Sequence, residues 1–172
     1  MPRVNWHASE WRRGIFLLIA AFVVVVDQLS KQWVRSHLLP GESLPEVGFL
    51  RLTHVLNTGS AFGLFANQAF LLSLVAIVGL VVILLFYRYL SRYNILGSLA
   101  LGLVFGGAVG NLIDRLSLGY VTDFIYVRLW HDFYWPAFNF ADSAITVGVI
   151  ALICFIFVGL KKENGHRSGV RS

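Results

Sequence analysis

Four long apolar segments constrain this chain more than any other feature of its sequence. They cover about residues 14–34, 69–88, 96–114 and 141–160, and the second and fourth are free of charge in their middles. Crossing ~30 Å of hydrocarbon takes about 20 helical residues. Because 57% of the 172 residues are hydrophobic and only 13% are charged, we predict an all-α membrane protein with four transmembrane helices. Residues 1–172 are expected to form a single membrane-embedded domain.

The first and third segments carry features that the other two lack. The first is apolar only from Gly14 to Val26, so it must bring Asp27 and Lys31 into the outer margin of the bilayer to reach spanning length. The third has glycines at four-residue spacing, which form a face that another helix can approach closely. That helix could belong to the same chain or to a second copy. The glycines are Gly102, Gly106 and Gly110.

Lysine and arginine set the predicted orientation. Nine of the 14 cations lie in the N-terminus, in the loop between the second and third segments and in the C-terminal tail. Seven of the nine acidic residues lie on the opposite side. Since cytoplasmic loops are enriched in Lys and Arg, we predict that both termini are cytoplasmic. A small β-containing region should then lie on the extracytoplasmic side.

Polar side chains gather at that outer side. Asp27 ends the first segment, Asn111 and Asp114 end the third, Asp142 opens the fourth, and Asp123 lies in the loop between the third and fourth. Carboxylates at membrane depth are costly and usually functional. Alternatively, these aspartates could cap helices or pair with the arginines of the same loop, which are Arg115 and Arg128.

Asp123 and Asp142 suit hydrolysis by a carboxylate pair. Two aspartates that meet in a low-dielectric site share a proton, so one can accept a proton from water while the other polarises a carbonyl. Asp27 and Lys31 stand four residues apart on one helical face, acid first, and are expected to form an ion pair that is structural or faces the substrate. Asn139 could hold Asp142 in place or bind the substrate backbone.

Other catalytic systems are poorly supported. The five histidines show no metal-binding spacing, so we expect neither a metal nor a cofactor. Ser30 and Lys31 are adjacent, and adjacent helical side chains point in different directions. The single cysteine, Cys154, lies in an apolar run and is expected to be a small core residue. The alternative to an enzyme is a small membrane carrier or scaffold that uses the outer acids without catalysis.

The two outer loops differ in composition. The first partly alternates over Phe49–Val55, which favours a short strand, and a turn is expected at Asn57-Thr58-Gly59. The second, from Ser117 to Phe140, is dense in aromatic residues. These residues could form a headgroup belt or a surface that accepts an acyl chain.

Five motifs in order make the chain resemble the bacterial lipoprotein signal peptidases (signal peptidase II, the prolipoprotein signal peptidases). The resemblance covers about residues 14–160, with two small departures, Thr122 in place of valine and Ser60 in place of alanine. The motifs are Asp27-Gln28-Leu29-Ser30-Lys31, Asn57-Thr58-Gly59-Ser60-Ala61-Phe62, Gly106 to Arg115, Val121-Thr122-Asp123-Phe124-Ile125 and Phe138-Asn139-Phe140-Ala141-Asp142-Ser143.

The resemblance implies an aspartic endopeptidase whose dyad is Asp123 and Asp142, with Asp114 as a rival for one place. It implies cleavage of diacylglyceryl-modified prolipoproteins just before the lipidated cysteine, inhibition by globomycin, and a site at the outer face of the bacterial cytoplasmic (inner) membrane. Membrane lipid is an expected partner, nucleic acid is not, and a monomer is expected. The supporting or substrate-binding residues would be Asp27, Lys31, Asn57, Gly107, Asn111, Asp114, Arg115, Asn139 and Ala141.

Overall fold

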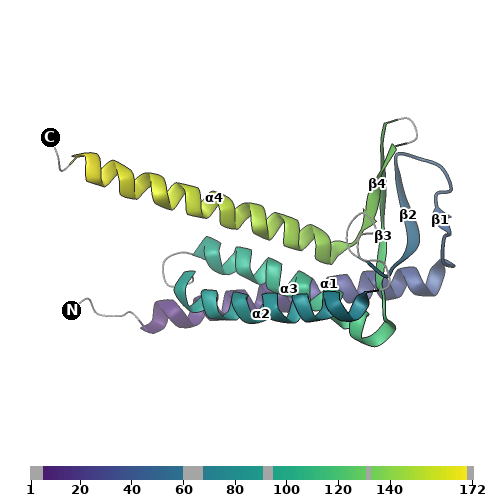
Figure 1. Cartoon of the computed structure of the whole chain (residues 1–172), viewed down its shortest axis with the longest axis horizontal. Coiled ribbons are helices and arrows are strands. Elements are labelled where there is room, and N and C mark those ends of the chain that lie inside the picture. The colour runs from purple at the N-terminus through teal and green to yellow at the C-terminus, as the bar shows by residue number, and fades with distance from the viewer. Residues whose placement is uncertain (1–5, 60–67, 91–94, 131–132, 170–172) are drawn as a thin grey trace.

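Four helices, each long and apolar enough to cross a membrane, dominate the computed structural model, which describes residues 6–59, 68–90, 95–130 and 133–169. This confirms the predicted multi-pass membrane protein. All four helices extend beyond the predicted segments. They are α1 (Trp6–His37), α2 (Ala69–Leu90), α3 (Ile95–Leu118) and α4 (Phe140–Gly169) (Figure 1).

Helix α3 is the centre of the bundle and packs against α1, α2 and α4. Its glycines allow the close approach to α1, because a Cβ built on Gly106 would lie 2.7 Å from the carbonyl oxygen of Ala20. Gly102 likewise faces the backbone of Phe16. The glycine stripe therefore packs inside the protein, which is the first of the two arrangements that the sequence left open.

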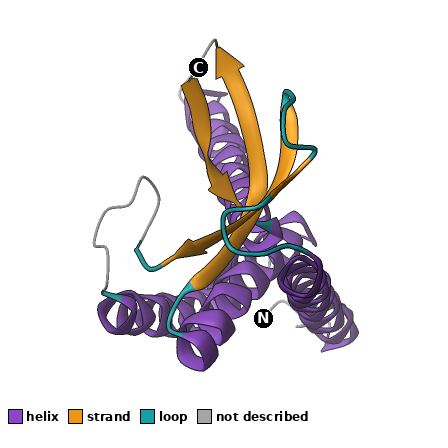
Figure 2. Cartoon of the chain, turned by 90° about the vertical axis from the view of Figure 1, so that its right-hand side faces the viewer, coloured by secondary structure: helices purple, strands orange, loops and turns teal. Residues whose placement is uncertain are grey.

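A four-stranded antiparallel sheet lies at the end of the bundle where α1 and α3 end and α4 begins. The strands follow one another in the order β1-β2-β3-β4 and run across the direction of the helices (Figures 1 and 2). The bounds are β1 (Ser43–Leu44), β2 (Leu50–Asn57), β3 (Val121–Trp130) and β4 (Phe133–Phe138).

Only part of this sheet was expected. The strand predicted over Phe49–Val55 is confirmed as β2, and the predicted turn is present, since the amide of Gly59 donates to the Asn57 Oδ1 atom at 3.0 Å. The rest of the turn motif, residues 60–62, lies outside the described residues. The aromatic loop instead forms the β3–β4 hairpin, because its β-branched and aromatic residues favour extended backbone.

A small apolar core holds the sheet on α1. The buried side chains of Val34, in the last turn of α1, and Leu38, directly after that helix, pack against Phe124 of β3. This core explains why α1 continues past the predicted end of the first segment. One expectation was wrong: Cys154 is exposed on α4 and is not a core residue. A helix surrounded by lipid leaves such apolar side chains outside the protein interior.

Candidate active site

A cavity of about 1030 Å³ lies where the sheet meets α3 and α4. Asp123 from β3 and Asp142 from α4 both line it, so strand and helix bring together two carboxylates that are 19 positions apart in the sequence. Much of the remaining lining is apolar and comes from β2, β4 and α4. The polar lining residues include Asn57, Asn111, Arg115 and Thr146.

Asp123 is held by two asparagine amides. The Nδ2 atom of Asn57 donates to Asp123 Oδ2 at 2.8 Å, and that of Asn139 donates to Oδ1 at 2.6 Å. Strand pairing sets the position of this carboxylate, because Asp123 lies opposite Val55 in the β2–β3 register. The residue is only 2% exposed.

Asp142 is fixed by the start of α4. The Asn139 side chain accepts from the backbone amide of Asp142 at 2.9 Å, and the Asp142 Oδ2 atom accepts from the backbone amide of Asn139 at 3.2 Å. This reciprocal pattern resembles a capping box, which satisfies two free amides at a helix N-terminus. The other carboxylate oxygen, Oδ1, accepts from Asn111 Nδ2 at 2.8 Å.

Groups that can only donate set the orientation of the three asparagine amides. Lys31 donates to Asn111 Oδ1 at 2.8 Å, while backbone amides donate to the Oδ1 atoms of Asn57 and Asn139. Each asparagine must therefore turn its NH₂ group to a carboxylate. As a result, three oriented amide donors surround Asp123 and Asp142.

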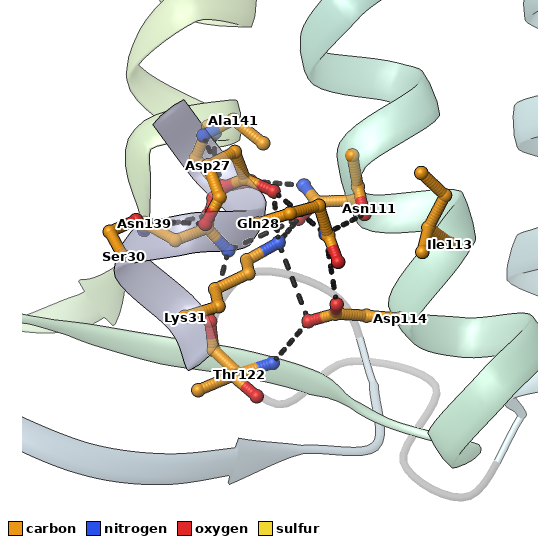
Figure 3. Close-up of polar contacts among 12 residues, drawn as sticks. Asp27, Gln28, Ser30, Lys31, Asn111, Ile113, Asp114, Thr122, Asn139 and Ala141 are labelled. Carbon is orange, nitrogen blue, oxygen red and sulfur yellow. Dashed lines mark hydrogen bonds and ion pairs between the residues drawn. The ribbon is translucent and has the colours of Figure 1, made fainter. Parts of the chain in front are cut away.

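A second group of charges, sealed from solvent and outside the cavity lining, joins α1 to α3 (Figure 3). Lys31 Nζ lies 2.8 Å from Asp27 Oδ2 and 3.4 Å from Asp114 Oδ2, and all three side chains are at most 1% exposed. Asp27 also accepts from the backbone amide of Ala141 at 2.9 Å, which ties α1 to α4. Of the two roles predicted for the Asp27–Lys31 pair, the buried position fits the structural one.

Asp114 belongs to this sealed group and does not line the cavity. It accepts from Gln28 Nε2 at 3.1 Å and from the backbone amide of Thr122 at 3.0 Å, and Arg35 lies 3.7 Å away. The Thr122 hydroxyl in turn accepts from Arg35 at 3.0 Å. Thr122 therefore faces away from the cavity lining, and its hydroxyl bonds to the protein itself.

Two more of the predicted residues, Arg115 and Gly107, lie at the cavity or at the helix contact beside it. Arg115 is half-buried, lines the cavity and interacts electrostatically with Asp142, Asp123 and Asp114. Gly107 lies against the backbone and side chains of α4, where a Cβ would collide with the carbonyl of Ala141. Within the described residues, no ion pair joins Arg115 or Arg128 to the cavity carboxylates, so simple charge pairing does not account for them.

Sequence reasoning gave no role to Gln28 and Arg35. Gln28 bridges α1 and α3, because its amide donates to the Gly110 carbonyl at 3.0 Å as well as to Asp114. Arg35 bridges α1 and β3 through Thr122. Gln28 lies in the motif Asp27-Gln28-Leu29-Ser30-Lys31. Arg35 follows Lys31 by four residues, and this helical spacing indicates that Arg35 lies near the same face as Asp27 and Lys31.

The environment of Asp123 favours a shared proton. Burial and the like charge of Asp142 raise the pKa of Asp123 to about 7, against the smaller opposing effect of the hydrogen bonds from Asn57 and Asn139. Asp123 therefore takes up and releases a proton near neutral pH, within the same cavity as a second carboxylate. Such a pair can act as a general acid and a general base on the same molecule.

Comparisons with known proteins show the family to which the chain belongs. A family model described as signal peptidase (SPase) II matches residues 19–158. The lipoprotein signal peptidase of Moorella thermoacetica is 49% identical over 88% of this chain and 97% of its own length, and that of Syntrophotalea carbinolica is 47% identical over 81% and 88%.

Two solved structures, each a bacterial membrane enzyme studied by the in meso method, share the fold. One has a TM-score of 0.79 and 35% identity over 87% of this chain and 91% of its own. The other has a TM-score of 0.74 and 37% identity over 83% and 92%. In the part of this chain that the structure describes, no group of three or more His, Cys, Asp or Glu side chains is placed to hold a metal ion.

Proposed function

The chain belongs to the signal peptidase II family of lipoprotein signal peptidases, and we propose that it is an aspartic endopeptidase whose catalytic dyad is Asp123 and Asp142. It removes the signal peptide from diacylglyceryl-modified prolipoproteins by cleaving just before the lipidated cysteine. The observation that carries this proposal is the placement of the two carboxylates in one cavity, where each feels the other's charge and, among the described residues, no ion pair neutralises either of them.

The two aspartates divide the chemistry between them. We assign the proton to Asp123, because burial and Asp142 raise its pKa to about 7. Ionised Asp142 takes a proton from water as the water oxygen bonds to the scissile carbonyl carbon, and Asp123 gives its proton to the carbonyl oxygen. When the C–N bond breaks, Asp142 gives the proton to the amine of the lipidated cysteine, and Asp123 takes back a proton from one hydroxyl of the intermediate as the carbonyl re-forms.

The supporting residues keep this geometry fixed. Asn57, Asn111 and Asn139 hold the carboxylates through amides whose orientation is already set. Groups fixed before the reaction need not reorganise as charge moves. Arg115, which lines the same cavity and interacts electrostatically with Asp123, is positioned to stabilise the negative charge that Asp123 carries after it gives up its proton.

The membrane setting follows from the same proposal. The whole chain, residues 1–172, acts as one peptidase domain in the cytoplasmic (inner) membrane of a bacterium, with both termini in the cytoplasm and the cavity at the outer face. The apolar part of the cavity lining suits a lipidated substrate within membrane lipid. The protein works as a monomer, and globomycin-type inhibitors occupy the cavity.

A cleavage assay tests the proposal. The purified protein is mixed in detergent with a prolipoprotein that carries the diacylglyceryl cysteine, and with the same precursor unmodified. We expect processing of the modified precursor only, ending at the cysteine by mass spectrometry, and none by Asp142→Asn. Glu46→Gln, which changes an exposed carboxylate away from the cavity, is the matched control and should remain active. A folded wild type that leaves the modified precursor intact would restore the carrier or scaffold alternative.

A further inference from the structure

The outer edge of the sheet borders the same cavity as the two aspartates. β4 is the last strand in the order β1-β2-β3-β4, and among the described residues no strand pairs with its other side. It is the strand on the α4 side of the sheet (Figure 1). Four consecutive residues of β4, 135–138, line the cavity. Because side chains alternate across a strand, one face would contribute only every second residue, so the cavity meets the edge of β4 with its backbone groups.

A proline lies within this stretch of β4. Proline has no N–H to donate, so within sheets it occurs on edge strands with its nitrogen on the unpaired side. β4 pairs with β3 on both sides of Pro136, because Val127 pairs with Trp135 and Ile125 pairs with Phe138. The proline thus blunts the edge against another long strand, whereas a short extended segment needs only the backbone groups on either side of it.

The end of β4 leads directly to the two carboxylates. Asn139 follows Phe138, the last residue of the strand, and its amide donates to Asp123 Oδ1 at 2.6 Å. Its side-chain oxygen accepts from the backbone amide of Asp142 at 2.9 Å. A peptide that lies along β4 therefore reaches Asp123 and Asp142 where the strand ends.

Hydrolysis by two carboxylates requires such an extended peptide. In a helix the backbone amide and carbonyl groups are bonded to one another along the axis and surrounded by side chains, so carboxylates cannot flank the peptide bond. Unwinding the segment leaves its N–H and C=O groups without partners, and burying them in a largely apolar cavity costs free energy. A strand edge supplies both donors and acceptors for an extended peptide.

We propose that β4 is the substrate-binding edge of the sheet. The residues of the prolipoprotein just before the lipidated cysteine unwind and pair with residues 135–138 as an added strand, which carries the scissile bond to Asp123 and Asp142. This inference rests on the proposed function, because it needs a peptide substrate in the cavity. It assigns substrate binding to backbone groups of β4 in addition to the side chains around the dyad.

Disulfide crosslinking tests the pairing without depending on cleavage. The background carries Cys154→Ala, which removes the single cysteine, and Asp142→Asn, which keeps the precursor intact. Ala137→Cys in this background is mixed in detergent with diacylglyceryl-modified precursors that each have one free cysteine, at the second, third, fourth or fifth residue before the lipidated cysteine. Side chains of neighbouring strands meet on the same face, so we expect one fast-reacting position and weaker reaction two residues away.

The register of the crosslinks identifies the paired strand. Trp135→Cys lies two residues along β4 from Ala137→Cys, so the fastest-reacting precursor position should move by two residues. Glu46→Cys, at an exposed position outside the cavity lining, should give no crosslink. The same fastest position for both β4 variants, or no alternation, would overturn the proposal. Crosslinks to Leu56→Cys in place of β4 would also overturn it and assign the substrate to β2.

A backbone ester tests the same contact with the unaltered enzyme. An ester oxygen cannot donate, so when two successive amides before the lipidated cysteine are replaced in turn, one ester should lower kcat/KM about tenfold. An ester in the middle of the apolar signal segment is the control and should change little. Unchanged kcat/KM for both test esters would overturn the pairing even though the parent precursor is cleaved. A parent precursor that is not cleaved would contradict the proposed function, while the crosslinks still report on β4.

Discussion

Two groups of aspartates lie near the end of the bundle that carries the sheet, and their surroundings differ. Asp27 and Asp114 are sealed from solvent and share the ammonium group of Lys31. Asp123 and Asp142 line a cavity and receive hydrogen bonds from neutral asparagine amides. A direct ion pair with a buried lysine therefore distinguishes the carboxylates that hold helices together from the carboxylates that line the cavity.

The two groups are also linked. Lys31 donates to Asn111, and Asn111 donates to Asp142, so the sealed group fixes one donor of the cavity group. The sealed group also connects α1, α3, α4 and β3. The contacts that hold the helices together thus also fix a residue that holds a cavity carboxylate in place.

Removing the buried cation should have the largest effect on stability. Lys31→Met leaves Asp27 and Asp114 without their ammonium partner, and breaking a buried ion pair in this way costs about 3–5 kcal/mol. We expect a lower thermal midpoint in detergent by circular dichroism. Arg12→Met is the control at a partly exposed arginine near the other end of α1, and an equal loss there would show that the effect is not specific to the sealed group.

The next largest effect should come from a change at Asn139, and it should appear in the rate of cleavage. Asn139→Ala removes the amide donor to Asp123, and loss of a fixed donor of this kind lowers the rate by about 10²–10³-fold. It also removes the α4 cap, which is worth about 1 kcal/mol.

Asn139→Ser separates these two roles of Asn139. Serine keeps a capping oxygen but has no amide to reach Asp123. Its thermal midpoint should therefore recover toward that of the wild type while kcat/KM stays low. Full activity of the serine variant would contradict a donor role for the Asn139 amide.

Adding a methyl group at Gly110 should crowd Asp27 and lower the stability of the protein without replacing any residue of the cavity carboxylate pair. A Cβ added at Gly110 would lie 2.5 Å from Asp27 Oδ2, so Gly110→Ala should cost about 1–3 kcal/mol through overpacking. Gly79 of α2 has nothing within 4 Å of such a Cβ. Gly79→Ala should therefore leave the thermal midpoint unchanged or slightly raised, and a matching loss at both positions would argue against crowding of Asp27.

The cavity pair should control the alkaline side of the pH profile. The pKa of Asp123 is raised from 3.8 to about 7, so its proton is lost as the pH rises through about 7, and kcat/KM should then fall about tenfold per pH unit. The sign for stability is the same: this group favours the folded state less as the pH rises from 3.8 to about 7. Asp142→Asn removes the like charge, so NMR titration of Asp123 should give a lower pKa.

Much of this molecule could be predicted from sequence, for identifiable reasons. The four helices follow from apolar length, and β2 from its alternation. The pairing of Asp27 with Lys31 follows from helical spacing, because both lie on one element. The β3–β4 hairpin was missed because its aromatic residues also suit a membrane belt.

The sequence could not separate Asp114 from Asp123, because the difference between them is spatial. Asp114 points to Lys31 outside the cavity lining, and Asp123 is carried into the cavity by strand pairing with β2. The direction of the three asparagine amides was equally hidden, since it depends on donors from distant segments. The exposure of Cys154 was also not predictable, because an apolar helix sequence does not show which of its faces packs against the other helices.

The most direct test of the contrast is to replace each of the four aspartates by asparagine and measure two quantities for every variant, the cleavage rate of folded protein and the thermal midpoint. Asp123→Asn and Asp142→Asn should lose about 10²–10⁴-fold in rate or more with an unchanged or raised midpoint. Asp27→Asn and Asp114→Asn should lower the midpoint first. An active Asp123→Asn beside a stable, inactive Asp114→Asn would contradict the account and move the dyad to Asp114.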